Sequence, residues 1–538
     1  MITRRSFVAS VAGLAGAPAL LRVGRVDADL VLRNGILHDG LGGPGREADV
    51  AITGDRVTAI GRRLGDRGRR EIDLRGLALA PGFIDIHSHG DGSLRTDPRA
   101  ESLVRQGITT IVVGQDGGSA APVEAGDPPR VIGFAEHFRT LEALHPAVNV
   151  ASMVGLGHLR RFVVGEANRP ASEVELARMT QLVEQALAEG ACGASTGLEY
   201  APGAFATREE LAALCRPLAA RRLAYATHMR NEDDRLLESI DEAIWVAREA
   251  GCPLQISHLK TQGPRNWRKL DDAFARIEAA AAAGLDVAFD RYPYIAYQTG
   301  LSNMFPVWAL DGGTSAFLAR LDASDTASRI RAESVAKAEL VGGWDNVQIA
   351  DVRAPDDKAA EGTRLGARAA SLGLDPYDYA VALLRRSDGR VGTVVFAMSE
   401  ENLERILAHP RGMVCSDGGA FAVDGPARRG HPHPRGLGTY ARVLGRYVRE
   451  RKSLTLERAI QKMTSMPASR AGLRDRGIVR VGASADLVAF DPATVTDRAT
   501  FAEPFQYPVG IEYVLVNGAV ALERGQRAPA GTGKALRP

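Results

Sequence analysis

Short apolar runs alternate with longer amphipathic stretches through the middle of the chain. Stretches with helical periodicity, such as ASEVELARMTQLVEQALAEG and LDDAFARIEAAAAAG, end in glycine, as helices often do. Eight strand-like runs lie between such stretches: FIDIHSH, GITTIVVGQD, VASMVGLGH, CGASTGLEY, LAYATHMRNE, PLQISHLK, DVAFDRYPY and GMVCSDGG. Eight strand–helix units predict an α/β fold, a (β/α)₈ barrel of the TIM type, whose active site lies at the carboxyl ends of the strands.

The two ends of the chain have a different pattern. ADLVLRNGILHDG and ADVAITGDRVTAIGRR at one end, and GIVRVGASADLVAFDP and IEYVLVNGAVALERG at the other, are short alternating runs broken by turns. They predict a small β-sandwich domain that both termini form together, from residues 27–82 and 471–538, around a barrel at 83–470. A long interval before the eighth strand predicts an insertion near 295–390, a lid or substrate-binding subdomain with TVVFAMSEENLERILAH as its last ordered part.

The first residues resemble an export signal. TRRSFVASVAGLAGAPALL places Arg4 and Arg5 before an apolar run of small residues, as in twin-arginine signals. The run is too short and too rich in Ala and Gly to span a membrane, and it ends near an Ala-Pro-Ala cleavage site. We expect residues 1–26 to be removed and the mature protein to be periplasmic or secreted, with no membrane attachment.

Composition excludes some classes of function. The chain has 538 residues and a formal net charge of +2, and its arginines are scattered rather than gathered into the basic stripe that nucleic-acid binding needs. The four cysteines form no C-x-x-C pair, so no disulfide framework is predicted and each is expected to be a small buried hydrophobic residue. A small-molecule partner is expected, and the oligomeric state is left open.

Metal-binding residue types fall at the ends of the predicted strands. In an extended strand, residues i and i+2 point to the same side, so His87 and His89 after the first strand can chelate one ion. His228 ends the fifth strand, His258 the sixth and Asp417 the eighth. Taken singly, each histidine is more often structural, but together they predict a site for zinc or a similar divalent ion.

At these motifs the chain resembles the metal-dependent amidohydrolases, and among them the N-acyl-D-amino-acid deacylases, or D-aminoacylases. The resemblance runs from about Ala28 to the C-terminus and rests on PGFIDIHSHGD, STGLEYAPG, THMRNE, SHLK, YPY, SDGG and HPRGLGTY. It implies a β-sandwich of terminal strands, an insertion that covers the active site, and a proton-transfer role for Asp417. It also implies a set of metal-site residues: His87, His89, His228, His258 and Asp417.

One position departs from the family pattern. These deacylases usually carry a metal-binding cysteine in a GNCG-like turn after the second strand, whereas this chain reads GQDGG with Asp116 there. A carboxylate can bridge two ions but is less selective for zinc than a thiolate, so we predict Asp116 as a bridging ligand and leave open whether one or two ions bind. An Asp that merely shapes a Gly-rich turn is the alternative. Glu199 in STGLEY is a substitute ligand, a substrate contact or a structural residue.

The expected chemistry is metal-assisted hydrolysis of an amide. A divalent ion lowers the pKa of its bound water towards ~7 and polarises the carbonyl, which supplies a hydroxide nucleophile. Asp417 is expected to take the water's proton and pass it to the departing amine. The carboxylate of the amino acid needs polar or cationic partners, and the candidates are Lys260, Arg291, Tyr292 and Arg435, of which Lys260 and Tyr292 match family positions. For Arg291 and Arg435 the alternative is a solvated surface charge.

The sequence therefore predicts a hydrolase that cleaves N-acyl-D-amino acids, or D-residue dipeptides, to a carboxylate and a free D-amino acid. A cyclic-amide hydrolase of the dihydroorotase or hydantoinase type is one alternative, although such enzymes usually have a lysine on the fourth strand and GASTGLEY has none. A non-catalytic metal-binding protein on the same fold is another. The presence of every histidine together with Asp417 argues against it.

Overall fold

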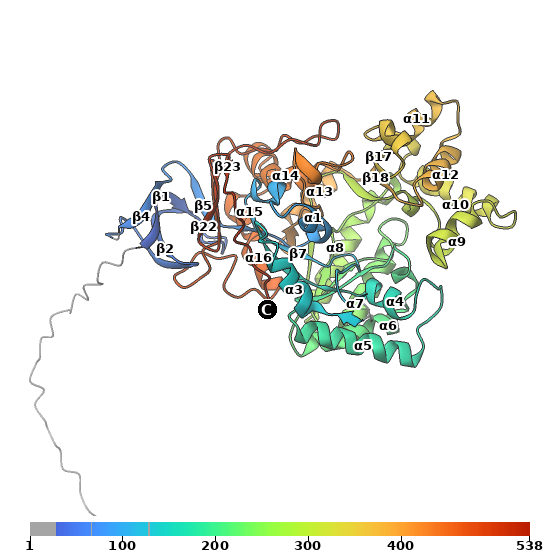
Figure 1. The fold of residues 1–538 in the computed structure, drawn as a ribbon, viewed down its shortest axis with the longest axis horizontal. Helices are drawn as coiled ribbons and strands as arrows, with labels where there is room; N and C mark the ends of the chain where they lie inside the picture. Colours follow the sequence, from blue (N-terminus) through green and yellow to red (C-terminus); the bar gives the residue numbers. More distant parts are fainter. Residues whose placement is uncertain (1–27, 66, 127–129) are drawn as a thin grey trace, which may run out of the picture.

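A ring of parallel strands forms the centre of the protein (Figure 1). The computed structural model describes residues 28–65, 67–126 and 130–538, so the predicted signal at 1–26 lies outside the described residues. Hydrogen bonds from the Asp417 amide to the His87 carbonyl and from the His89 amide to the Gly418 carbonyl, both 2.9 Å, join the first strand to the last. The strands are β6 (Phe83–Asp85), β7 (Ile108–Val113), β10 (Asn149–Ser152), β11 (Val154–Gly155), β12 (Gly193–Gly197), β13 (Ala224–His228), β14 (Leu254–Ile256), β15 (Val287–Arg291) and β19 (Gly412–Val414).

Helices surround this ring, as the strand–helix alternation predicts. Successive residues of a strand face either the inside of the barrel or the surrounding helices. Val112 and Ala288 pack inside the barrel, whereas Ile111 and Phe289 pack against the helices. The helices are α1 (Gly90–Thr96), α2 (Glu101–Val104), α3 (Phe134–Glu142), α4 (Leu156–Val163), α5 (Glu173–Ala188), α6 (Arg208–Ala219), α7 (Leu236–Ala250), α8 (Leu270–Ala282), α13 (Glu400–Ala408), α14 (Arg435–Arg442), α15 (Leu456–Met463) and α16 (Ser465–Arg470).

Strands from both ends of the chain form one β-rich unit beside the barrel (Figure 1). Its nine strands are joined where β5 pairs antiparallel with β20, with Ala80 opposite Val488. Leu32, Val50 and Leu515 belong to a hydrophobic core of its own. The strands are β1 (Ala28–Leu37), β2 (Arg46–Thr53), β3 (Arg56–Gly61), β4 (Gly68–Asp73), β5 (Ala78–Pro81), β20 (Leu487–Phe490), β21 (Ile511–Val516), β22 (Ala519–Glu523) and β23 (Gln526–Arg527).

An inserted subdomain lies between β15 and β19, on the far side of the barrel from the β-rich unit (Figure 1). Its antiparallel sheet has the order β16-β18-β17, and Phe305, Phe317 and Tyr377 pack beneath it. Its elements are β16 (Ala296–Gly300), α9 (Gly313–Arg320), α10 (Ala327–Leu340), β17 (Val347–Val352), α11 (Leu365–Ser371), α12 (Pro376–Arg386) and β18 (Val391–Phe396).

The boundary of the insertion differs from the sequence interpretation. Strand β18 belongs to the inserted sheet, but α13, which we assigned to the insertion, packs on the barrel. Ile406 and Leu407 of this helix share a core with Phe289 of β15, so α13 is a barrel helix. A short hairpin of β8 (Val123–Ala125) and β9 (Arg130–Ile132) completes the described strands. No helix in the described ranges is both long and apolar enough to cross a membrane.

Candidate metal centre

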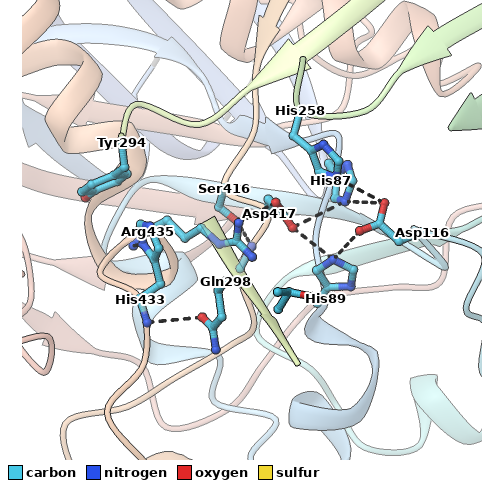
Figure 2. Close-up of polar contacts among 12 residues, drawn as sticks. His87, His89, Asp116, His258, Tyr294, Gln298, Ser416, Asp417, His433 and Arg435 are labelled. Atoms are coloured by element: carbon cyan, nitrogen blue, oxygen red, sulfur yellow. Dashed lines mark hydrogen bonds and ion pairs between the residues drawn. The ribbon is translucent and has the colours of Figure 1, made fainter. Parts of the chain in front are cut away.

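The six predicted metal ligands converge at one end of the barrel. Each follows or ends a different parallel strand, except for the first pair, which follows β6 together. Figure 2 shows several of their side chains pointing toward one another from separate segments of the chain. This is the edge at which TIM-type barrels assemble catalytic groups, because the carboxyl ends of all the strands meet there. The residues are His87, His89, Asp116, His228, His258 and Asp417.

The first group of ligand atoms contains the two histidines after β6. The Nε2 atoms of His87 and His89 each lie 3.4 Å from a carboxylate oxygen of Asp116. They lie 3.6 and 3.1 Å from Oδ1 of Asp417 (Figure 2). Two imidazoles and two carboxylates converge here, and one atom from each lies within 4.8 Å of the others, which is the spacing of a metal-binding cluster.

The second group shares Asp116 with the first. Its Oδ1 lies 3.5 Å from Nε2 of His258, and its Oδ2 lies 3.7 Å from Nδ1 of His228. The two imidazole nitrogens are 3.0 Å apart. Asp116 is therefore the one residue that belongs to both clusters, which is the placement expected of a bridging ligand.

Several of these buried polar atoms have no hydrogen-bond partner among the described residues. They include Nε2 of His87 and Oδ1 of Asp116. Leaving a buried donor or acceptor unpaired is costly, so native structures pair such atoms or use them for function. Imidazole nitrogens and carboxylate oxygens that converge in this way, with unpaired atoms among them, fit a divalent ion such as zinc.

The backbone is strained at three of the ligands. Asp116, His258 and Asp417 have φ values of +51°, +36° and +49°, in the left-handed region that non-glycine residues seldom adopt. At His258 the strained amide is held by Asp290, whose Oδ1 accepts its hydrogen at 2.8 Å. Strain of this kind persists where surrounding contacts impose it, and it concentrates at functional sites.

Buried carboxylates lie behind three of the histidines. Nδ1 of His87 lies 3.5 Å from Asp290, and Nδ1 of His258 lies 3.1 Å from Glu232. Nε2 of His228 lies 3.6 Å from Glu199. Carboxylates in this position fix the tautomer and orientation of a metal-binding imidazole. Glu199, whose role the sequence left open, therefore lies behind a predicted ligand.

Sequence reasoning missed Glu232 and Asp290. Both are fully buried acids. Asp290 lies in β15, and Glu232 follows β13 within the quoted THMRNE motif. Both carboxylate oxygens of Glu232 accept hydrogen bonds from Nζ of Lys260, at 2.7 and 2.6 Å. Glu232 also accepts a 2.8 Å hydrogen bond from Nε2 of Gln262. The available signal was an unexplained acid inside a motif that already contained a predicted ligand.

Neighbouring charges strongly shift the pKa values of the groups in the cluster. Burial opposes the charge on Asp417, but Arg435 and His87 outweigh it and hold the pKa of this carboxyl far below its usual value. Burial also disfavours the charged form of His89, yet the neighbouring carboxylates raise its pKa to about 9. The metal-free cluster thus attracts protons, and a divalent cation must displace them in order to bind.

A cavity of about 570 Å³ opens over the ligands, and its walls include three of the four predicted substrate contacts: Lys260, Tyr292 and Arg435. Nη1 of Arg435 donates to Oδ2 of Asp417 at 2.5 Å, and its guanidinium lies over the Tyr292 ring. The Tyr292 hydroxyl is buried with no hydrogen-bond partner in the described part of the chain. Strand β16 contributes Gln298 to the cavity lining.

Arg291 does not lie where the sequence predicts a substrate contact. Its buried side chain does not line the cavity. It donates to the Tyr294 carbonyl at 2.7 Å, and its guanidinium lies over the Tyr292 ring. Arg291 is the last residue of β15, and its hydrogen bond to the Tyr294 carbonyl and its contact with the Tyr292 ring hold the guanidinium away from the cavity lining.

Comparison with known proteins decides the family. Residues 424–522 match the model of the family described as "Amidohydrolase family". An N-acyl-D-glutamate deacylase of Alcaligenes xylosoxydans xylosoxydans is 40% identical over 501 residues, which cover 91% of this chain and 93% of the relative. The chain belongs to the N-acyl-D-amino-acid deacylase family of amidohydrolases. The predicted family and fold class are confirmed.

Solved structures agree with this assignment. The N-acyl-D-glutamate deacylase of Bordetella bronchiseptica, in complex with zinc and a phosphonate mimic of the tetrahedral intermediate, has a TM-score of 0.82 and 35% identity. The match covers 95% of this chain and all of that one. A D-aminoacylase studied for its binuclear metal centre has a TM-score of 0.81 and 35% identity over the same shares.

Proposed function

We propose that this amidohydrolase is a zinc-dependent deacylase that hydrolyses the amide bond of N-acyl-D-amino acids to a carboxylate and a free D-amino acid. One observation carries the proposal: a carboxylate shared by two histidine clusters forms the floor of a cavity whose wall brings three carboxylate-binding groups together. The named deacylases among its relatives, and the zinc in the Bordetella enzyme, support the same chemistry.

The six ligand residues would hold one or two divalent ions, and such ions polarise the amide carbonyl and make a water molecule acidic. Asp417 is the residue placed to move the proton. Its Oδ1 lies among the imidazoles, and its Oδ2 is bound by Arg435. This carboxylate accepts the proton of the attacking water and then donates it to the nitrogen of the leaving amino acid, as general base and then general acid.

The wall of the cavity binds the α-carboxylate of the substrate. Arg435, Lys260 and the unpartnered hydroxyl of Tyr292 all line it. Glu232 neutralises Lys260, and Asp417 neutralises part of Arg435, so both cations stay in fixed positions before the substrate arrives. Such preorganised hydrogen-bond donors recognise a carboxylate with little loss of side-chain entropy. Binding at this wall places the acylated nitrogen above the ligand cluster.

The proposal is tested by a substrate panel on the zinc-loaded protein. The panel contains the N-acetyl forms of D- and L-glutamate, aspartate and leucine, together with hydantoin and dihydroorotate. We expect turnover of at least one N-acetyl-D-amino acid and none of the cyclic amides. Preferential hydrolysis of a cyclic amide would support the hydantoinase-type alternative, and binding of zinc without any turnover would support a non-catalytic role.

We further propose export from the cytoplasm. The support is the Arg4-Arg5 pair before an apolar run of small residues. A twin-arginine route carries folded proteins, which suits a barrel that must acquire its metal before it leaves. The substrate would then be hydrolysed in the periplasm or outside the cell.

A further inference from the structure

A fully buried histidine connects the inserted subdomain to the arginine of the cavity wall. His433 lies two residues before Arg435, and its side chain is 0% exposed. Its backbone amide donates to Oε1 of Gln298 at 3.2 Å, and its Nε2 lies 2.9 Å from the carbonyl of Ala296. Its Nδ1 lies 2.9 Å from the backbone amide of Arg435. Figure 2 shows the contact of His433 with Gln298.

These neighbours permit only one protonation state of the ring. The Ala296 carbonyl can only accept, so Nε2 must carry a hydrogen. The Arg435 amide can only donate, so Nδ1 must be bare. Burial lowers the pKa of His433 well below its usual value, and Arg435 lowers it further. The neutral Nε2–H tautomer therefore satisfies both contacts at once.

The ring is also fixed in orientation by aromatic neighbours. It packs edge-on against Tyr294, with centroids 5.1 Å apart, and against Phe501 at 4.9 Å. Tyr292 lies 6.0 Å away. Rotation of the imidazole would clash with these rings as well as break both hydrogen bonds.

The two groups that His433 connects both line the cavity. Gln298 lies on β16 of the inserted sheet and lines the cavity. Arg435 is the first residue of α14, and its guanidinium contacts both Asp417 and the Tyr292 ring. A shift of the Arg435 backbone would therefore move the guanidinium away from the place where the α-carboxylate binds.

We propose that His433 is a positioning residue, whose neutral imidazole accepts a hydrogen bond from the Arg435 amide at Nδ1 and thereby sets the guanidinium for the substrate's α-carboxylate. The substrate part of this proposal rests on the proposed function. The structural part, the bond from the Arg435 amide to the ring, does not.

Two substitutions test the hydrogen bonds of the two ring nitrogens separately. His433→Asn places an oxygen near the position of Nδ1 and can still accept from Arg435. His433→Gln extends its amide toward the position of Nε2, so it can still donate to the Ala296 carbonyl but leaves the Arg435 amide unpaired. Both variants are similar in polarity, so a general loss of packing would affect them alike.

The first measurement is hydrogen–deuterium exchange of the peptide that contains Arg435, on the zinc-loaded protein. We expect His433→Gln to speed exchange of this amide by about ten-fold or more, which corresponds to one lost buried hydrogen bond, and His433→Asn to leave it near the wild-type rate. Wild-type protection in His433→Gln would overturn the proposal. So would equal loss of protection in both variants.

The second measurement is the kinetics with the best N-acetyl-D-amino acid. His433→Gln should raise KM by about ten-fold while kcat changes less than about three-fold, and His433→Asn should keep both near wild type. In an Arg435→Ala background, His433→Gln should have no further effect on kcat/KM, because the two residues act as one unit. A multiplicative effect would overturn the proposal. Absence of wild-type turnover would instead contradict the proposed function, and the exchange experiment would still decide the role of His433.

Discussion

Replacement of Asp116 tests whether one carboxylate joins the two histidine clusters. Its two oxygens lie 3.4 to 3.7 Å from nitrogens of four histidines, and the clusters share no other residue. Asp116→Asn keeps the size of the side chain and, like Asp, tolerates the left-handed backbone at φ +51°. This substitution therefore removes the charge with little added strain.

The size of the effect follows from the ligands that remain. Without Asp116, the first cluster falls from four ligand residues to three, and the second falls from three to two neutral imidazoles. Loss of an outer hydrogen-bond partner already weakens metal binding by about 10- to 100-fold, so loss of a direct ligand should reach at least ~100-fold, or ~2.7 kcal/mol. The cluster of two imidazoles should lose its ion first.

Equilibrium dialysis against zinc, with elemental analysis, measures this effect. We expect two zinc ions per wild-type chain, and at most one in Asp116→Asn and Asp116→Ala. Asp116→Cys restores the residue usual in the family and should retain zinc, because a thiolate is a good zinc ligand, although the left-handed backbone should cost it about 1 kcal/mol of stability. Unchanged zinc stoichiometry in Asp116→Asn would refute the bridging role and leave Asp116 as a turn residue.

Three further predictions address the surroundings of the site and the signal segment. His228→Ala and His258→Ala should each lose most of the metal and activity while the thermal melt still shows a folded barrel. Full metal occupancy in either would remove that residue from the site. Glu232→Gln should weaken zinc binding by about 10- to 100-fold, because this carboxylate orients one imidazole and neutralises a buried ammonium; unaltered affinity in dialysis would assign it a purely structural role. Replacement of Arg4 and Arg5 by lysine should leave the protein in the cytoplasm, and export at the wild-type level in cell fractionation would contradict the signal assignment.

The sequence identifies the side chains that meet at the strand ends because their positions are tied to local pattern. His87 and His89 share one side of an extended segment, and each later ligand follows an apolar run, so the barrel topology alone brings them together. Glu232 could not be found in this way, since its role depends on Lys260 and His258 across a strand boundary. Arg291 shows the reverse error, because its position at the end of β15 does not reveal that its guanidinium contacts the Tyr292 ring and the Tyr294 carbonyl rather than the cavity.

The boundary of the insertion escaped prediction for a different reason. Helix α13 has an ordinary amphipathic pattern, and only tertiary packing shows that Ile406 contacts the barrel core rather than the inserted subdomain. Similarly, nothing in HPHPR indicates that His433 reaches strand β16, since that contact joins segments 137 residues apart. Pattern thus identifies which side chains a strand presents, whereas the neighbours of a buried polar group depend on the complete fold.

The central claim is that the histidine–carboxylate cluster, loaded with metal, hydrolyses an N-acyl-D-amino acid. The most direct test removes all metal with a chelator and then follows the initial rate with N-acetyl-D-glutamate, and with its L enantiomer, as zinc is added back in known equivalents. We expect no turnover without metal, a rate that appears within the first two equivalents, and hydrolysis of the D form at least about 100-fold faster, which is ~2.7 kcal/mol of transition-state discrimination. Full activity in the metal-free protein, or equal rates for the two enantiomers, would contradict this claim.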